Sequence, residues 1–187
     1  MRLQKFTLWG MMMQTNSVKG LYHFMVWYLL ILLALIGADQ GLKWWITSHL
    51  AIGESTSFLP GIMRFTRLHN YGAAWSSLSG KTVVLLVITT VLMVAVAVLL
   101  VKKIVRHPLG VSACLLILGG GLGNYIDRIF RGYVVDMFDL QFMSYPIFNL
   151  ADCFVVVGVI LGAVYYLWIY EKCDRKGKDE NDTASHK

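Results

Sequence analysis

The chain has 187 residues, of which 57% are hydrophobic and 15% charged, and its formal net charge at pH 7 is +6. This composition is too apolar for an ordinary soluble domain and predicts a membrane protein. The positive charge does not indicate nucleic-acid binding, because the basic residues form no surface with interleaved aromatic side chains.

The first apolar stretch, Leu21–Ala38, follows Lys19 and resembles the start of a secretory signal peptide. It is long for such a segment, shows no small-residue cleavage pattern and leads into Asp39, so we interpret it as a membrane span. A span needs about 20 mainly apolar residues. By this measure we expect four transmembrane helices, over 21–46, 82–103, 109–130 and 147–170.

The basic residues indicate which way these spans run. Three precede the first span, three lie between the second and third, and five follow the fourth. They are Arg2, Lys5, Lys19, Lys102, Lys103, Arg106, Lys172, Arg175, Lys176, Lys178 and Lys187. The positive-inside rule then places both termini in the cytoplasm. We expect one integral-membrane domain over 1–187, with cytoplasmic segments 1–20 and 171–187, the second disordered, and extracytoplasmic segments 47–81 and 131–146.

The segment 47–81 is too long for a simple connection and contains turn signals at Gly53, Pro60 and Gly61. We expect a small surface sheet here, with Ile62–Asn70 as one strand. The predicted fold class is therefore an all-α membrane protein with four transmembrane helices and a small β-rich extracytoplasmic segment on the membrane surface.

Acidic residues outside the tail all map to the outer half of this topology. Asp152 is the clearest candidate for function, because an ionisable group within a span is costly. Its simplest alternative role is to complement the dipole at a helix start. The third span ends at the same face with Asp127, Asp136 and Asp139, and spacing alone leaves open which of them faces Asp152.

Two carboxylates that approach closely away from water share a proton, because both cannot ionise cheaply. One can then accept a proton from a water that attacks a peptide carbonyl, while the other donates to the carbonyl oxygen. Asp127 could instead be held ionised by Arg128 or another basic partner, and Asp139 could simply be solvated. The pattern predicts a hydrolase without a covalent intermediate.

Other polar features have structural interpretations. GGGLGN, at 119–124, favours close helix packing, although it could also leave room for a substrate helix. Asp39 and Lys43 are four residues apart on one helical face and predict an ion pair, which could line the edge of the site. Neither the three cysteines nor the five histidines show the spacing of a zinc site, so we expect no metal and no other cofactor.

Four motifs together resemble the lipoprotein signal peptidases, also called signal peptidase II. They are DQGLK (39–43), NYGAAWS (70–76), GNYIDR with the following VVD (124–136) and FNLAD (148–152). The resemblance implies that Asp136 and Asp152 are the catalytic pair. By the same resemblance, polar residues bind the substrate or organise the pair, namely Asn70, Asn124, Asp127, Arg128 and Asn149. Asn149 lies three residues before Asp152, where a hydrogen bond along one helical face is reasonable.

The family removes the signal peptide from diacylglyceryl-modified bacterial prolipoproteins, cleaving before the lipidated cysteine. The resemblance implies an intramembrane aspartic endopeptidase of the bacterial cytoplasmic (inner) membrane, monomeric, with prolipoproteins and membrane lipid as partners and its site facing outward. The sequence departs from the family in two places. Trp75 stands where phenylalanine is usual, and the segment MFDLQFMSYP between the two aspartates is shorter than in some relatives, which leaves the shape of a lid open.

Two other functions are compatible with acidic residues in a membrane protein. A proton-coupled transporter would also carry intramembrane acids, but transport sites lie near the membrane midplane and these acids gather at one face. A non-enzymatic assembly protein would use them only for packing and solubility. Assays in proteoliposomes separate the three functions. Peptide cleavage supports the protease, substrate flux supports the transporter, and the absence of both supports the assembly protein.

Overall fold

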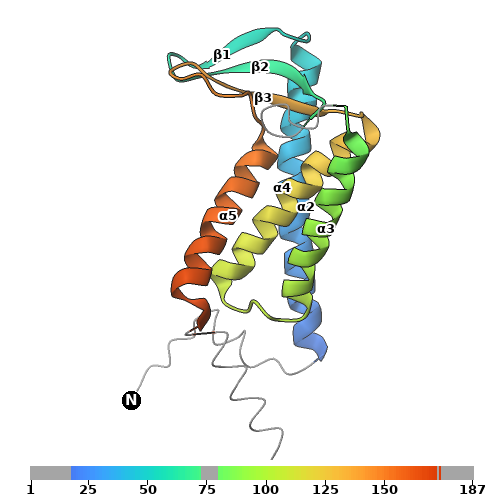
Figure 1. Ribbon diagram of the computed structural model, residues 1–187, viewed down its shortest axis with the longest axis vertical. Helices are drawn as coiled ribbons and strands as arrows, with labels where there is room; N and C mark the ends of the chain where they lie inside the picture. Colours follow the sequence, from blue (N-terminus) through green and yellow to red (C-terminus); the bar gives the residue numbers. More distant parts are fainter. Residues whose placement is uncertain (1–17, 73–79, 172, 174–187) are drawn as a thin grey trace, which may run out of the picture.

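The computed structural model of the protein describes residues 18–72, 80–171 and 173. Four long helices stand side by side, and a small sheet lies across one end of them (Figure 1). In chain order the elements are α2 (Val18–His49), β1 (Ser55–Leu59), β2 (Met63–Asn70), α3 (Thr82–Val101), α4 (Pro108–Phe130), β3 (Val134–Leu140) and α5 (Leu150–Trp168). The expected N-terminal segment up to residue 17, Trp75 and nearly all of the tail lie outside the described residues.

Helix α4 is the central helix of the bundle, and it packs against α2, α3 and α5. It begins with Pro108, whose missing N–H costs nothing in a first turn, and the side chain of His107 accepts a hydrogen bond from the Leu109 amide. Half of the most apolar part of α4 is buried, compared with 6% to 17% in the other three helices. The helix therefore forms the interior against which the others are arranged.

The glycine-rich run of α4 allows close contact with its neighbours. A Cβ atom on Gly120 would overlap the carbonyl oxygen of Ala151, and one on Gly123 would lie 2.6 Å from Oδ2 of Asp39. Both glycines are buried. The packing interpretation of this run is confirmed, and it brings α4 against Asp39 of α2 and against the first turn of α5.

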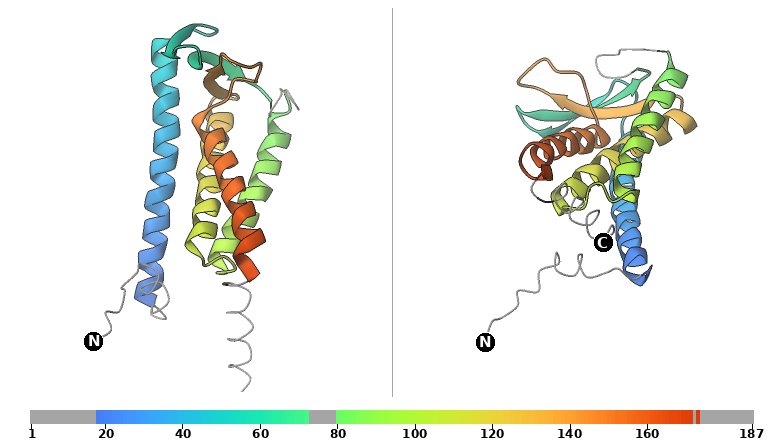
Figure 2. Two further views of the ribbon diagram at one scale, coloured as in Figure 1. Left: turned by 90° about the vertical axis from the view of Figure 1, so that its left-hand side faces the viewer. Right: turned by 60° about the horizontal axis from the view of Figure 1, so that its bottom comes forward.

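All four helices are long and apolar enough to cross a membrane. Exposed valine, isoleucine and leucine side chains cover the outward sides of α2, α3 and α5, as expected for surfaces that contact lipid. The left view of Figure 2 shows the helices roughly along one axis, with the sheet at one end. The predicted fold class, with four spans and a small sheet, is confirmed.

The sheet is antiparallel with the order β1-β2-β3. Strand β3 pairs with β2, which comes from much earlier in the chain. A bulge on β2 between Phe65 and Leu68 shifts the register with β3. Beneath the sheet, Phe65 and residues of β3 pack on the last turns of α2. This core consists of Ile46, Leu50, Phe65, Val135 and Met137.

The fourth long helix begins later than the expected span. The chain up to Phe148 stays extended, because the backbone of Phe148 pairs with that of Phe138 on β3. Helix α5 starts at Leu150, so Asp152 lies in its first turn. Asp152 is thus placed directly beside the sheet.

Candidate active site

Asp136 lies in the middle of β3 and is 1% exposed. Its two carboxylate oxygens accept hydrogen bonds from two amide side chains on different elements. Nδ2 of Asn70, at the end of β2, lies 2.9 Å from Oδ2, and Nδ2 of Asn149 lies 2.6 Å from Oδ1. The expected association of Asn70 and Asn149 with Asp136 is therefore present in the structure.

Asp152 forms a reciprocal cap with Asn149 at the start of α5. The Asp152 amide donates to Oδ1 of Asn149 over 3.0 Å, and the Asn149 amide donates to Oδ2 of Asp152 over 3.1 Å. Asn149 has an extended backbone and is the N-cap, so it does not share a helical face with Asp152 as the sequence suggested. Nδ2 of Asn124, from α4, donates to Oδ1 of Asp152 over 2.7 Å.

Asn149 thus contacts both carboxylates, and we call Asp136 and Asp152 the aspartate pair. Burial raises the pKa of Asp136 most, the negative charge of Asp152 raises it further, and together they bring it from 3.8 to about 7. The hydrogen bonds from Asn70 and Asn149, and more weakly the charge of Lys43, act in the opposite direction. Near neutral pH Asp136 can therefore both hold and release a proton, as acid–base chemistry requires.

A second group of charges lies next to the pair, and we call Asp39, Lys43 and Asp127 the lysine cluster. Nζ of Lys43 lies 2.8 Å from Oδ2 of Asp39 and 2.9 Å from Oδ2 of Asp127, and all three side chains are 0% exposed. The expected ion pair between Asp39 and Lys43 is confirmed. The principal partner of Asp127 is Lys43, although the guanidinium of Arg131 also lies 3.8 Å from Oδ1 of Asp127.

The lysine cluster contacts residues next to the aspartate pair in three places. Oδ1 of Asp39 accepts from the amide of Ala151, which precedes Asp152, over 3.0 Å. Oδ2 of Asp127 accepts from the amide of Val135, which precedes Asp136, over 3.2 Å. The third contact is through Asn124: Nζ of Lys43 donates to its Oδ1 over 2.9 Å. The cluster therefore holds the backbone beside each member of the pair.

Gln40 is a member of this network that the sequence analysis did not select. Its Nε2 atom lies 3.2 Å from Asp39, 3.1 Å from the carbonyl oxygen of Gly123 and 3.3 Å from Asp127. The available signal was a polar amide inside an apolar span, directly after Asp39. Such a side chain needs partners in the protein, because lipid offers none.

Arg128 has a different role from the one that its neighbour Asp127 suggested. Its guanidinium donates to the carbonyl oxygen of Gly72 over 2.9 Å and to that of Asn124 over 3.3 Å. Oδ1 of Asn70 accepts from the amide of the same Gly72 over 2.8 Å. Arg128 and Asn70 thus fix the backbone at the end of the sheet, next to the pair.

Asp139 is not simply solvated, because its carboxylate has defined partners on the sheet. On the sheet it lies opposite Arg64, whose Nε atom is 2.7 Å from Oδ2, and Thr66 donates to the same oxygen over 3.0 Å. Its side chain is 14% exposed. Among the residues that the structure describes, no three histidine, cysteine, aspartate or glutamate side chains are grouped so as to hold a metal ion.

Comparison with known proteins agrees with this geometry. The family model for signal peptidase (SPase) II matches residues 31–168, which include the lysine cluster and the aspartate pair. The chain belongs to the signal peptidase II family. This membership identifies a membrane protease and decides against the transporter and the assembly protein.

Relatives in the signal peptidase II family match over most of their length. The lipoprotein signal peptidase of Enterococcus faecalis is 42% identical over 83% of this chain and 96% of the relative. The lipoprotein signal peptidase of Streptococcus pyogenes is 45% identical over 75% of this chain and 92% of the relative. Two solved structures, both described as bacterial membrane enzymes, are 34% identical to this chain. The first has a TM-score of 0.73 and matches over 77% of this chain and 89% of its own. The second has a TM-score of 0.72 and matches over 78% of this chain and 96% of its own.

Proposed function

We propose that Asp136 and Asp152 are the catalytic pair of an aspartic endopeptidase that removes the signal peptide from diacylglyceryl-modified prolipoproteins, cleaving before the lipidated cysteine. The observation that carries this assignment is the shared contact with Asn149, which donates from its side chain to Asp136 and from its backbone to Asp152. Two carboxylates fixed in this way, of which Asp136 has a pKa of about 7, can act as an acid and a base.

The raised pKa of Asp136 suggests how the two roles divide. Asp152 accepts a proton from a water molecule as that water attacks the peptide carbonyl carbon. Protonated Asp136 donates its proton to the carbonyl oxygen, which gives a neutral tetrahedral intermediate. The intermediate collapses as the C–N bond breaks: the amine nitrogen takes a proton from Asp152, and one hydroxyl of the intermediate returns a proton to Asp136. No bond forms between enzyme and substrate.

The position of the pair suits a substrate that stays in the membrane. Asp152 lies in the first turn of a membrane-length helix and Asp136 on the sheet beside it, so a substrate helix could remain in lipid while one peptide bond reaches the pair. The lipid chains on the cysteine then never need to leave the bilayer.

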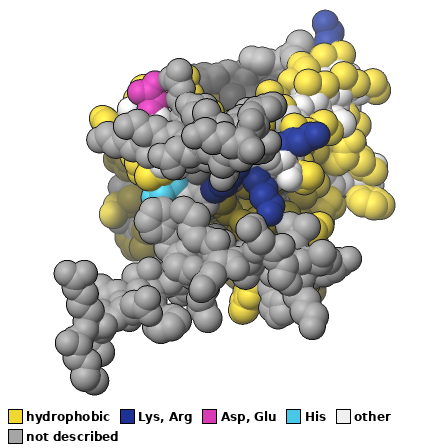
Figure 3. Space-filling model, turned by 90° about the horizontal axis from the view of Figure 1, so that it is seen from below, with side chains coloured by type: hydrophobic (Ala, Val, Ile, Leu, Met, Phe, Trp, Pro, Cys, Tyr) yellow, Lys and Arg dark blue, Asp and Glu magenta, His cyan; other side chains and the backbone are white. Residues whose placement is uncertain are grey.

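Charge distribution supports an outward-facing site. At the end of the bundle opposite the sheet, the turn between α3 and α4 carries Lys102, Lys103 and Arg106, all exposed. Figure 3 views that end, where lysine and arginine side chains gather beside apolar helix surfaces. Basic residues favour the cytoplasmic side. The sheet and the aspartate pair would then face out of the cell, with both termini inside.

Substitution of each member of the pair tests the assignment. Asp136→Asn and Asp152→Asn should each reduce cleavage of a lipidated prolipoprotein in proteoliposomes by at least about 10²–10⁴-fold, because each removes an acid–base group. Near-normal cleavage by either variant would disprove the catalytic pair. Monodisperse behaviour in detergent and a normal unfolding midpoint are the controls that separate lost chemistry from lost folding.

A further inference from the structure

The end of the sheet farthest from α2 carries exposed apolar side chains, and we call this region the sheet tip (Figure 1). It is formed by the turn between β1 and β2 and by the loop after β3. Its members are Leu59, Ile62, Phe142, Met143 and Tyr145, which are between 43% and 65% exposed. Exposed apolar groups of this kind mark contact surfaces when they are contiguous.

The two loops of the sheet tip form one surface. The amide of Gln141 donates to the carbonyl oxygen of Ile62 over 2.9 Å, and Met63 pairs with Leu140 where the strands begin and end. The apolar side chains of the turn and of the loop after β3 are thus held side by side. Both views in Figure 2 keep these two segments together.

The sheet tip is placed above the surface that α5 presents to lipid. In Figure 1 the strands run across the helix ends, and the tip extends sideways beyond the top of α5. Below it, the outward side of α5 exposes Val156, Val157 and Ile160. The loop from the tip leads directly into α5 at Leu150, so the apolar surface of the tip continues toward that of the helix.

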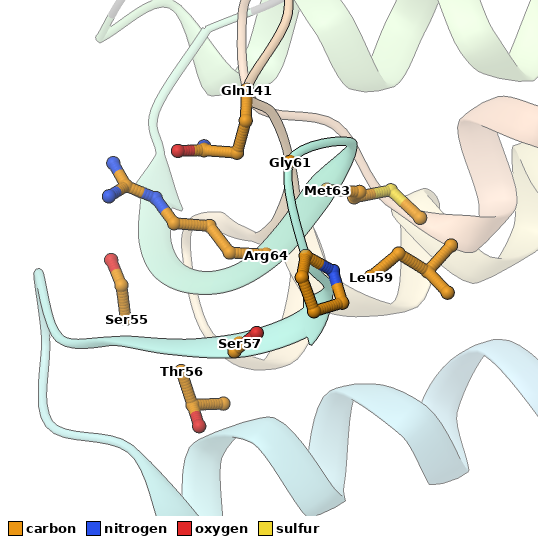
Figure 4. A pocket seen from close by; sticks show the side chains of 9 residues that line it. Ser55, Thr56, Ser57, Leu59, Gly61, Met63, Arg64 and Gln141 are labelled. Carbon is orange, nitrogen blue, oxygen red and sulfur yellow. The ribbon is translucent and has the colours of Figure 1, made fainter.

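A hollow of about 250 Å³ beside the sheet tip separates polar from apolar groups. Figure 4 shows Ser55, Arg64 and Gln141 on one side of it and the apolar side chains of Leu59 and Met63 on the other. A surface divided in this way fits the boundary between lipid headgroups and acyl chains, where polar and apolar surroundings meet.

From this placement we infer that the sheet tip inserts into the headgroup–acyl boundary of the leaflet beside α5. The partner is the lipid surface itself. Burial of apolar side chains stabilises the inserted state, and insertion ties the sheet to the membrane at the end opposite α2. Strand β3 carries Asp136 between these two attachments, so the tip fixes the height of that carboxylate relative to the bilayer.

Site-specific fluorescence tests the insertion. Cys114, Cys153 and Cys173 are replaced by alanine in the full chain, and retained cleavage activity qualifies this parent. Phe142→Cys and Ile62→Cys, each labelled with the environment-sensitive dye NBD, report on the sheet tip. Ile52→Cys is the matched control, since Ile52 is 64% exposed and Phe142 65%, but Ile52 lies in the turn beside α2. The labelled proteins are reconstituted in vesicles containing phosphatidylglycerol, with and without spin-labelled lipid.

We expect NBD at both tip positions to emit at shorter wavelength than at position 52, and to be quenched by the spin-labelled lipid at least about twofold more strongly. Emission and quenching at 62 and 142 equal to those at 52 would overturn the inference, whether all three positions report water or all three report lipid. Neither readout depends on cleavage, so the result is independent of which carboxylates are catalytic.

Discussion

The lysine cluster and the aspartate pair are neighbouring groups of acids, all buried except the partly exposed Asp152, and the fold treats them in opposite ways. In the cluster, Asp39 and Asp127 both contact the ammonium of Lys43 at under 3 Å. The carboxylates of the pair accept hydrogen bonds from neutral amides, those of Asn70, Asn124 and Asn149. Among the described residues, no cation lies within ion-pair distance of either member of the pair.

This difference separates a structural group from a chemical one. The carboxylates of the cluster are engaged directly by the ammonium of Lys43, whereas those of the pair have neutral amides as their side-chain hydrogen-bond donors. The cluster then has a different task, which is to hold the amides of Ala151 and Val135 beside the pair. The predictions below test this division, beginning with the largest effect.

Removal of Lys43 should be the most damaging single change. Lys43→Met leaves two fully buried carboxylates without their ammonium, and an uncompensated buried charge costs about 3–5 kcal/mol. We expect a large drop in the thermal unfolding midpoint in detergent and little folded protein. Lys102→Met, at an exposed position on the opposite end, is the matched control and should unfold like the wild type.

A rescue experiment distinguishes lost charge balance from lost packing. Adding Asp39→Asn and Asp127→Asn to Lys43→Met removes both unpaired charges and should recover part of the lost stability. If the triple variant is no more stable than Lys43→Met alone, charge compensation is not the function of Lys43.

Asp136 should make stability depend on pH. Because its folded-state pKa is raised from 3.8 to about 7, the folded state binds the proton more tightly than the unfolded state does. The stability from this group is fully present below pH 3.8 and is lost as the pH rises through about 7. The loss amounts to about 4 kcal/mol. Unfolding of Asp136→Asn should lack this dependence, and parallel pH curves for the two proteins would contradict the raised pKa.

The cleavage rate should also depend on the protonation of Asp136. We expect activity to fall as the pH rises above about 7, because Asp136 then loses the proton that it donates. Asn70→Ala removes a hydrogen bond that lowers the pKa of Asp136, so the alkaline limb of its pH–rate profile should move to higher pH. A shift to lower pH would mean that this limb belongs to another group.

Asn124 connects the two groups, so its loss should have an intermediate effect. Its Oδ1 atom accepts from Lys43 and its Nδ2 atom donates to Asp152. A hydrogen bond to a charged group contributes roughly 1.5–3 kcal/mol, so Asn124→Ala should lower kcat/KM about 10- to 100-fold. Tyr125→Phe is the matched control on the next residue, since the Tyr125 hydroxyl contacts only Thr90 among the described residues. Equal losses in both variants would argue for general damage to α4.

Much of this arrangement could be predicted from the sequence. The lengths and hydropathy of the apolar stretches predicted the four helices, and the family motifs selected Asp136 and Asp152 from several acids. The partner of Asp127 was left open between Arg128 and another basic residue. It is Lys43 on α2, because the glycines of α4 allow α2 to approach closely enough for contact. Such a contact depends on packing between distant segments, which no local pattern records.

The environment of Asp139 could not be predicted for a different reason. A strand pattern was visible around Arg64 and Thr66, but the register between β2 and β3 was not. The bulge between Phe65 and Leu68 shifts that register, and it sets Arg64 opposite Asp139 while Leu68 lies opposite Asp136. Likewise, Asn149 acts as a cap only because Phe148 remains paired with β3 and delays the start of α5.

Asp139 therefore provides the smallest and most specific test. It lies on the same strand as Asp136, but its partner Arg64 is 47% exposed, and an ion pair open to solvent contributes at most about 1 kcal/mol. Asp139→Asn should change stability by no more than that amount and leave prolipoprotein cleavage within about twofold of wild type. The measurement uses the proteoliposome assay and the unfolding conditions applied to Asp136→Asn. If Asp139→Asn lost activity as severely as Asp136→Asn, a carboxylate already paired with a cation would be required for chemistry. The distinction between acids held by cations and acids held by amides would then fail to identify the catalytic pair.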